Sequence, residues 1–267
     1  MERNFSIKIA DLKINLNDIF SDKLRRWYCF FLSRSHFPEI SLNLDYIPAK
    51  RNLPLRVKKK EGQVFQIERS DFFAEIDFAS FQGELKVAKN IYSFDSFLRI
   101  LYSLYLLYND GFLLHSAGIK KDGKVYLFSG SSLSGKTTVI RHLGPTLTNE
   151  NAILSDEIIA IRKEKHNGGN YFFFAYPTPF WGEFKSSENI NNQRAKIDRI
   201  FFLGNRNFAK LSFNEAVERL LENTIFFSRD PSSVAKLFNL GIEFLQQIPS
   251  YQLKATEGVQ SYLNFPK

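Results

Sequence analysis

The stretch best suited to chemistry is a glycine-rich segment between Val125 and Leu143, which reads VYLFSGSSLSGKTTVIRHL. It contains the pattern G-x-x-x-x-G-K-S/T, preceded by an apolar run that ends at Ser129 and followed by apolar residues at helical spacing. Glycines and small serines let successive backbone N–H groups turn toward one anion, and the positive end of the following helix adds to this effect. The spacing therefore predicts a loop that binds the phosphates of a nucleoside triphosphate.

Each residue of this loop has an expected part in binding. The Lys136 ammonium would reach the β- and γ-phosphates, and the Thr137 hydroxyl would bind Mg²⁺. The expected nucleotide contacts come from the loop and the first turn of its helix: Gly130, Ser131, Ser132, Leu133, Ser134, Gly135, Lys136, Thr137 and Thr138.

Two adjacent acids interrupt an apolar run soon after this loop. Asp156 and Glu157 lie within AILSDEIIAI, residues 152–161. Because unpaired buried carboxylates are costly, we expect the pair to face Mg²⁺ and phosphate; the alternative is an acid pair at a strand end in solvent. Neighbouring side chains of an extended strand point to opposite faces, so one of the two acids should lie nearer the nucleotide.

A histidine is expected beside the same loop. Two apolar runs flank the tetrapeptide Lys-Asp-Gly-Lys at residues 121–124, and Asp-Gly is a strong signal for a hairpin turn. A two-residue turn pairs Lys121 with Lys124, so that paired residue numbers sum to 245 and His115 faces Gly130. A longer turn would shift this register by one residue, and a packed or surface histidine without a role is the alternative reading.

Composition limits the compartment and the partners. A chain of 267 residues, 44 % of them hydrophobic and 24 % charged, can form one large or two modest globular domains. The net charge of +8 favours anionic partners without choosing between nucleic acid and phosphate-bearing substrates. Cys29 is the single cysteine, which excludes an intrachain disulfide and suits a reducing compartment, and its apolar neighbours favour a buried thiol. The polar N-terminus and the lack of a membrane-length apolar run predict a cytoplasmic protein.

The pattern of elements predicts an α/β protein in two parts. Residues 1–92 carry mostly strand-like runs and no catalytic motif, so we expect a β-rich accessory domain. Its basic segment, residues 50–60, is either a solvated loop or a docking patch for an acidic peptide or nucleic acid. No aromatic residue interleaves with these charges, which favours the solvated loop.

The second part, residues 93–267, holds all the motifs above. It opens with a predicted helix over residues 93–108, for which Ser93 is the expected N-cap. Later, residues 177–184 (PTPFWGEF) form an aromatic loop just after a predicted strand. Such loops often carry substrate contacts, and a Trp181 side chain that fills a gap in the core is an equal alternative.

Several segments of the second part together resemble a known family. LHSAGI, GSSLSGKTT and ILSDEIIAI resemble the catalytic domain of HPr serine kinases, whose fold is shared with ATP-dependent phosphoenolpyruvate carboxykinases. PTPFWGEF, IDRIFFLG, LSFNEAVERLL and IPSYQLK are more specifically similar to HPr-kinase-related proteins of peptide natural-product gene clusters, such as lasso-peptide kinases. The resemblance covers roughly residues 93–255. It implies a P-loop kinase core of the HPr kinase C-terminal type with a mixed sheet.

The resemblance implies ATP-dependent transfer of the γ-phosphate to a hydroxyl, with a serine of a precursor peptide or protein as the leading candidate. Asp156 would accept the proton of that hydroxyl, and His115 would orient Asp156 or contact the γ-phosphate. Lys136 would hold the phosphates, while Thr137 with Glu157 or Asp156 would hold Mg²⁺.

The sequence also departs from the family pattern. Leu133 stands where HPr kinases usually have glycine, Glu157 replaces a second aspartate, and the glycine-rich substrate loop of those kinases is missing. HPr itself is therefore not the expected acceptor.

Two other functions remain open from the residues alone. A P-loop ATPase would use Asp156 on Mg²⁺ and Glu157 to activate water, and a nucleotide-sensing protein would bind ATP without turnover. The expected partner is a peptide or protein that carries an acceptor serine. Nucleic acid and membranes are not favoured, and a homo-oligomer is compatible with the sequence.

Overall fold

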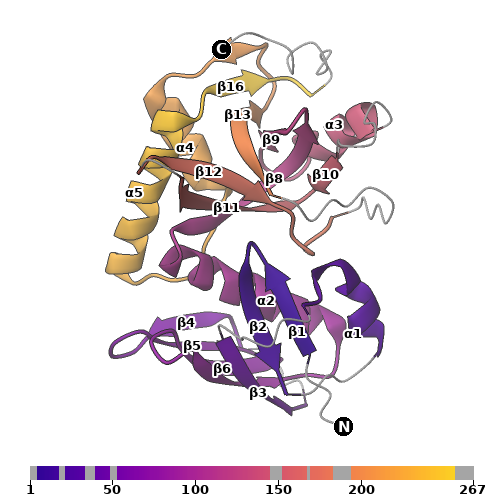
Figure 1. Ribbon diagram of the computed structural model, residues 1–267, viewed down its shortest axis with the longest axis vertical. Helices are drawn as coiled ribbons and strands as arrows, with labels where there is room; N and C mark the ends of the chain where they lie inside the picture. Colours follow the sequence, from indigo (N-terminus) through magenta and orange to yellow (C-terminus); the bar gives the residue numbers. More distant parts are fainter. Residues whose placement is uncertain are drawn as a thin grey trace. The chain divides into compact units, whose positions relative to one another are not determined.

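The computed structural model describes residues 5–17, 22–33, 40–48, 53–144, 152–166, 169–182 and 194–255. The chain divides into two compact units, each with a mixed sheet (Figure 1), so the expected α/β class is confirmed. The first unit comprises Met1–Tyr105 with Phe226–Ala235, and the second comprises Leu106–Ile225 with Lys236–Lys267. Two elements run across this division, so it differs from the boundary expected after residue 92.

The first unit is built on a seven-stranded sheet with the order β1-β2-β3-β7-β6-β5-β4. Its strands are β1 (Phe5–Ile9), β2 (Leu12–Leu16), β3 (Ile40–Tyr46), β4 (Arg56–Lys59), β5 (Val64–Arg69), β6 (Phe72–Asp77) and β7 (Gln82–Val87). β3 pairs in parallel with β2 and β7, whereas the hairpins from β4 to β7 are antiparallel. Buried and less buried residues alternate along β3 and β6, as expected for strands with one face on a core.

Helix α2 (Ile91–Tyr108) packs on this sheet, which explains where the division falls. The Tyr102 hydroxyl donates to the Leu12 carbonyl at 3.0 Å. The Phe97 ring packs edge-on against Phe72 at a centroid distance of 5.9 Å. Most of the helix therefore belongs to the first unit, because its aromatic side chains complete that unit's core.

The N-cap of α2 is Asn90, and the prediction of Ser93 was wrong. The Asn90 Oδ1 accepts from the Ser93 backbone N–H at 2.8 Å, which is the bond that a cap residue makes to the third helical residue. The Ser93 hydroxyl in turn donates to the Asp71 carboxylate.

The basic segment is a strand at β4 rather than a loop, and two of its lysines are paired with acids. Lys59 Nζ lies 3.4 Å from Asp230 Oδ2, and Lys60 Nζ lies 2.6 Å from Glu75 Oε2. Residues 50–52 lie outside the described part of the chain. Because Lys59 and Lys60 already have acidic partners, they do not form a free cationic patch.

The remaining elements of the first unit are helix α1 (Asp22–Trp27) and the 3-10 turn η1 (Cys29–Phe31). Cys29 is exposed, contrary to the expectation of a buried thiol. The turn buries Phe31 instead and leaves the cysteine at the surface.

Asp230 caps helix α5 (Pro231–Gln247) within the first unit. Its Oδ2 accepts from the Ser233 backbone N–H at 2.9 Å and from the Ser232 and Ser233 hydroxyls at 2.6 and 2.8 Å. These hydrogen bonds stabilise the ionised carboxylate and hold the pKa of Asp230 well below its usual range. The bonds from the Ser232 and Ser233 hydroxyls contribute most to this shift.

We expect Asp230→Ala to cost about 1 kcal/mol of stability at pH 7, the usual value of an N-cap. The pKa of Asp230 is lower in the folded protein than its unfolded value of about 3.9. The stabilisation that depends on the Asp230 charge is therefore fully present above about pH 3.9 and is lost as the pH falls through the folded-state pKa. Denaturant unfolding at pH 7 and below pH 3 measures both parts, with Asp230→Asn as the control that keeps the acceptor. Wild-type stability of Asp230→Asn at pH 7 would contradict a role for the charge.

The second unit is built on a nine-stranded sheet. Its strands are β8 (Gly111–Lys121), β9 (Lys124–Ser129), β10 (Ala152–Ser155), β11 (Ile158–Lys165), β12 (Tyr171–Tyr176), β13 (Ala195–Leu203), β14 (Ala209–Lys210), β15 (Thr224–Ile225) and β16 (Ser250–Leu253). The pairings β8–β11, β11–β12, β12–β13, β13–β9 and β9–β8 form a closed circuit. Its weakest link is β12–β13, which pairs only at Phe174↔Lys196 and Ala175↔Ala195.

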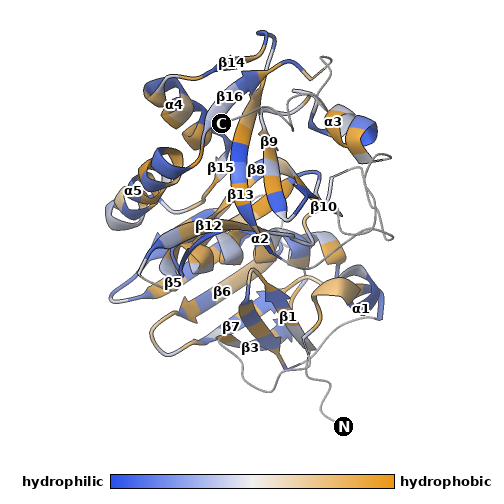
Figure 2. Ribbon diagram, turned by 45° about the horizontal axis from the view of Figure 1, so that its top comes forward, coloured by the Kyte–Doolittle hydropathy of each residue, from blue (hydrophilic) through white to orange (hydrophobic). Residues whose placement is uncertain are grey.

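Helices cover both faces of this sheet. Helix α3 (Lys136–Leu143) packs on a cluster that includes Ala117 and Phe128, while Phe244 of α5 packs edge-on against Phe112 and Phe173. Because Phe112 and Ala117 are an odd number of residues apart along β8, their side chains lie on opposite faces of the sheet. Figure 2 shows hydrophobic and hydrophilic sides on α3, as its burial pattern requires. Helix α4 (Phe213–Asn223) begins with the predicted capping box of Ser212 and Glu215.

The β8–β9 hairpin has the predicted register. Lys121 pairs with Lys124, and the ladder continues to Ser116↔Ser129 with paired numbers that sum to 245. Asp122 and Gly123 have φ values of +53° and +73°, as a two-residue turn with two left-handed positions requires.

In the part of the chain that the structure describes, no helix combines the length and the apolar character needed to cross a membrane.

Candidate functional site

The glycine-rich loop connects the end of β9 to the start of α3, as the sequence predicted. Gly135 is the N-cap, with φ +100°, and its carbonyl accepts the first helical bond from Val139 N at 3.0 Å. At Gly130 an added Cβ would lie 2.5 Å from Ser134 Oγ. Both glycines are therefore required by the geometry, one by its φ and the other by close packing inside the loop.

Lys136 lies inside the curve of this loop. Its Nζ donates to the carbonyl oxygens of Gly130 and Ser131 at 2.7 and 2.9 Å, and the residue is only 7 % exposed. Burial lowers the pKa of the Lys136 ammonium, and the carboxylates of Glu157 and Asp156 oppose part of this shift. The loop and the acid pair, which are separated along the chain, are therefore near enough for both carboxylates to affect the pKa of this ammonium.

The acid pair lies in a turn between β10 and β11, and the expectation that the two acids have extended strand geometry was wrong. The ladder with β8 shifts register between Ile153 and Ser155, so β10 carries a bulge just before the acids. The Ser155 hydroxyl then accepts from the backbone N–H groups of Glu157 and Ile158, both at 3.2 Å. This local bonding holds a turn where the sequence alone suggested strand.

Strand alternation therefore does not separate the two acids. Both carboxylates influence Lys136, but their surroundings differ. Asp156 is 3 % exposed, and its Oδ1 accepts from the Gly182 backbone N–H at 2.9 Å. Glu157 is only partly buried. One acid is thus fixed by the backbone, and the other has access to solvent.

The described part of the aromatic loop, residues 177–182, is bonded to the acid turn. The Thr178 hydroxyl donates to the Ile158 carbonyl at 2.6 Å, and the Ser155 hydroxyl lies 3.4 Å from the Phe180 carbonyl as a donor. Trp181 is partly buried against the hydrophobic cluster beneath α3, which favours the packing alternative for this side chain. Glu183 and Phe184 lie outside the described residues.

His115 lies on β8 beside both features. Its carbonyl accepts from the Ser129 hydroxyl at 3.0 Å, and it pairs in register with Ile158, next to the acid turn. By strand alternation it shares the face of Ala117 and Ile119, the residues that pack beneath α3. The structure therefore brings the predicted histidine, loop and acids into one region of the second unit.

One observation indicates that the loop fits a phosphate group. Ser134 Oγ is buried and has no hydrogen-bond partner among the residues that the structure describes. A buried hydroxyl without a partner is costly, so a ligand with oxygen acceptors would satisfy it.

The other predicted loop residues differ in exposure. Ser131 and Ser132 are exposed, and Thr137 and Thr138 are partly buried at the start of α3. Leu133 is fully exposed, with φ +66°. A leucine in this left-handed conformation is strained, and its side chain packs against nothing to compensate.

Protein side chains alone do not form a metal site in the described ranges. Nowhere in them do three His, Cys, Asp or Glu side chains gather as a group that could hold a metal ion. Mg²⁺ usually keeps several waters and binds one or two carboxylates together with substrate phosphates. Thr137 and one acid of the 156–157 pair are compatible with that kind of site.

Sequence reasoning missed three residues that shape this region. Ser155 builds the acid turn, Gly182 holds Asp156, and Ala255 lies against the glycine-rich loop. The Ser before two acids is a weak signal for such a turn. The contact of Ala255 with Gly135 joins residues far apart in the chain, so no local pattern could indicate it.

The Ala255 contact gives a test of the loop geometry. An added Cβ at Gly135 would lie 2.3 Å from the Ala255 Cβ, and Gly135 also has a positive φ. We therefore expect Gly135→Ala to cost about 2 kcal/mol, from backbone strain plus steric overlap. The double variant with Ala255→Gly should recover the overlap part only. Equilibrium unfolding of both single variants and the double variant measures this recovery, and strict additivity would contradict the contact.

Comparison with known proteins assigns no family: no family model matches the chain, and no curated protein matches it.

Proposed function

We propose that the chain is an ATP-dependent kinase with a P-loop core of the HPr kinase type, which transfers the γ-phosphate to a serine hydroxyl of a peptide or protein. The observation that carries the proposal is the environment of Lys136. Its buried ammonium lies within a glycine-rich loop that opens a helix, and two acids from a separate turn influence it. Phosphoryl transfer needs this combination of an anion cradle, a cation and carboxylates.

Each group has a part in the proposed reaction. The loop N–H groups, the Ser134 hydroxyl and Lys136 would bind the phosphates; Lys136 would exchange its bonds to the loop carbonyls for bonds to phosphate oxygens. Thr137 and Glu157 would hold Mg²⁺, which supplies neutralisation of phosphate charge. His115 lies on the sheet face that packs beneath α3, and it would orient Asp156 or contact the γ-phosphate.

Asp156 would act as the base. The Gly182 N–H fixes its Oδ1, and the carboxylate held in this way would accept the proton of the acceptor hydroxyl. Burial keeps this carboxylate away from bulk water, so a peptide hydroxyl rather than water would be the group that it deprotonates.

One observation favours the second candidate, a P-loop ATPase. Glu157 is the more open of the two acids and could activate a water molecule, while the fixed Asp156 would bind Mg²⁺. In that case phosphate would be released from ATP without a peptide acceptor.

The proposal is tested by ATP turnover with Lys136→Met, which keeps the aliphatic stem and removes the ammonium. We expect ATP affinity or turnover to fall by at least an order of magnitude, since the main side-chain contact to the phosphates is lost. Lys210→Met, at an exposed lysine of β14, is the matched control. Phosphate release and peptide phosphorylation are measured in parallel, and unchanged affinity together with unchanged turnover in Lys136→Met would refute nucleotide binding at this loop.

A further inference from the structure

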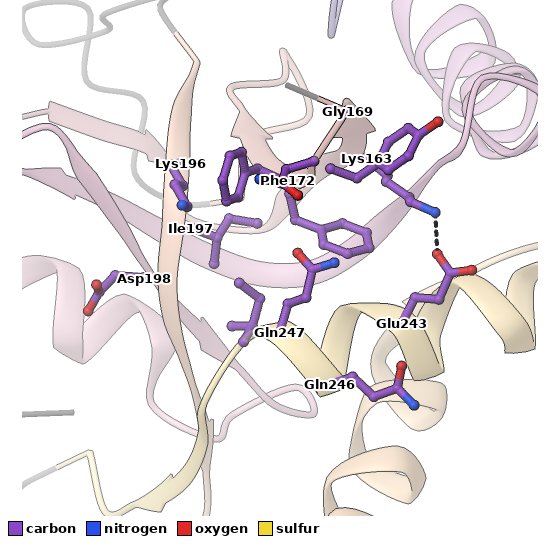
Figure 3. A pocket seen from close by; sticks show the side chains of 13 residues that line it. Lys163, Gly169, Phe172, Lys196, Ile197, Asp198, Glu243, Gln246 and Gln247 are labelled. Carbon is purple, nitrogen blue, oxygen red and sulfur yellow. Dashed lines mark hydrogen bonds and ion pairs between the residues drawn. The ribbon is translucent and has the colours of Figure 1, made fainter. Parts of the chain in front are cut away.

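A pocket of about 560 Å³ lies in the second unit where β12 and β13 separate (Figure 3). The two strands pair only at Phe174↔Lys196 and Ala175↔Ala195. Beyond these pairs the two facing edges have no ladder partner among the described strands, at residues 171–173 of β12 and 197–199 of β13. On the β13 side, the next strand, β16, pairs only from Ile200 onward. The C-terminal turn of α5, with Gln246 and Gln247, forms another wall.

Open strand edges accept extended chains. Unpaired backbone N–H and C=O groups are a template on which a peptide can add as a strand, and pockets beside the edge then select its side chains. The wall of this pocket is firm, since Phe173 is buried and packs edge-on against Phe244 at a centroid distance of 5.2 Å. The volume lies within the range of ordinary ligand pockets.

The charges that line the pocket leave one cation uncompensated. Lys163 is paired with Glu243 at 2.6 Å, and Asp198 is paired with Arg199 at 2.8 Å. Lys196 is exposed, and among the residues that the structure describes no acid pairs with it. Its Nζ instead lies 3.4 Å from the centre of the Phe172 ring. The pocket therefore presents a lysine above an aromatic ring, next to two exposed glutamine amides.

We propose that this pocket is a docking site for an extended acidic segment of a peptide, which adds as a strand to the edge of β12 and places a carboxylate at Lys196. As a substrate-recognition site the proposal rests on the kinase function above, but peptide binding itself does not depend on ATP turnover. The chain's net charge of +8 would also attract an acidic segment from a distance.

The position of the pocket predicts a spacing in the substrate. Lys196 lies at the start of β13, opposite Lys124, and Phe202 lies opposite Ser129, where the P-loop begins. The six residue-to-residue steps from Lys196 to Phe202 span about 20 Å, so an extended peptide needs at least about six residues between the docked segment and the acceptor serine.

Binding is tested by fluorescence anisotropy without nucleotide, with a fluorescein-labelled Glu-Val-Glu-Val-Glu-Val peptide. We expect saturable binding to the wild type, at least tenfold weaker binding to Lys196→Glu, and less than a twofold change in Lys210→Glu, a charge reversal elsewhere in the same unit. The same peptide N-methylated at every residue should bind at least tenfold more weakly, because neither of its edges can then donate backbone hydrogen bonds to a strand.

Three outcomes would overturn the proposal: no saturation up to about 1 mM peptide, equal weakening by the Lys196 and Lys210 reversals, or unchanged binding of the N-methylated peptide. Lys196→Glu should keep wild-type ATP affinity, so loss of ATP binding in Lys136→Met and loss of peptide binding in Lys196→Glu report on different sites. Peptide binding without any phosphorylation of longer serine peptides would refute the kinase function and leave the docking site standing.

Discussion

Asp156→Asn should reduce phosphoryl transfer to a serine acceptor by about 10²–10⁴-fold, the usual contribution of a general base. The amide keeps the shape of the carboxylate, and its oxygen can still accept from the Gly182 N–H. It cannot take up the acceptor proton. Binding of ATP–Mg²⁺ should change by less than about tenfold, because in this proposal Thr137 and Glu157 provide the protein ligands to Mg²⁺.

The companion variant Glu157→Gln separates the kinase from the ATPase. In the kinase, Glu157→Gln should weaken Mg²⁺-dependent ATP binding and leave single-turnover transfer from bound ATP less affected. In the ATPase the pattern reverses: Asp156→Asn would chiefly weaken Mg²⁺ binding, and Glu157→Gln would trap bound ATP.

Both variants are compared by titration of ATP–Mg²⁺ and by single-turnover transfer, with Glu218→Gln on α4 as an exposed control acid in the same unit. A Glu157→Gln protein that binds ATP tightly without turnover, beside an Asp156→Asn protein that no longer binds Mg²⁺, would refute the assignment of Asp156 as base.

The features predicted correctly from the sequence are those set by short-range chemistry. The Asp122-Gly123 turn fixes the β8–β9 register, because only residues that tolerate positive φ fit its two central positions. The strand–loop–helix arrangement around Lys136 follows from glycine and lysine spacing between a strand and a helix. The placement of His115 beside this loop then follows from counting residues along the hairpin.

The acid pair shows why the remaining features could not be predicted. Strand alternation would have placed Asp156 and Glu157 on opposite faces, but a bulge and the Ser155 hydroxyl break the strand at that point. A bulge depends on the neighbouring strand as much as on its own residues, so AILSDEIIAI reads as a plain strand. The same holds for the Gly182 N–H on Asp156, which joins segments 26 residues apart.

The boundary between the units depends on tertiary packing in a similar way. The sequence of α2 is apolar on much of its surface, which indicates burial without naming the partner. The structure shows that Phe97 and Tyr102 pack on the first sheet, so the division falls near the end of the helix. Segment 226–235 joins the first unit although it lies between two segments of the second in the chain, and composition gives no sign of that return.

Arg199→Met should lower the free energy of unfolding by about 3 kcal/mol, because it leaves a buried carboxylate without its closest cation. Asp198 is the extra residue of a bulge in β13, where the ladder with β9 shifts register. The bulge lets two neighbouring side chains meet, and Arg199 Nε lies 2.8 Å from Asp198 Oδ2. Both residues are buried, at 4 % and 5 % exposure.

A double-variant cycle isolates the pair from the packing of the arginine stem. The single changes Arg199→Met and Asp198→Asn should each destabilise the protein, while the double variant should be at least about 1 kcal/mol more stable than their sum, because it leaves no buried charge unpaired. Lys124→Met is the control: its Nζ lies 3.5 Å from Asp198 Oδ1, but its side chain is 55 % exposed, so its loss should cost under about 1 kcal/mol. Unfolding in denaturant measures all four variants. Additive single effects would mean that Asp198 and Arg199 do not stabilise each other and that other neighbours compensate their charges.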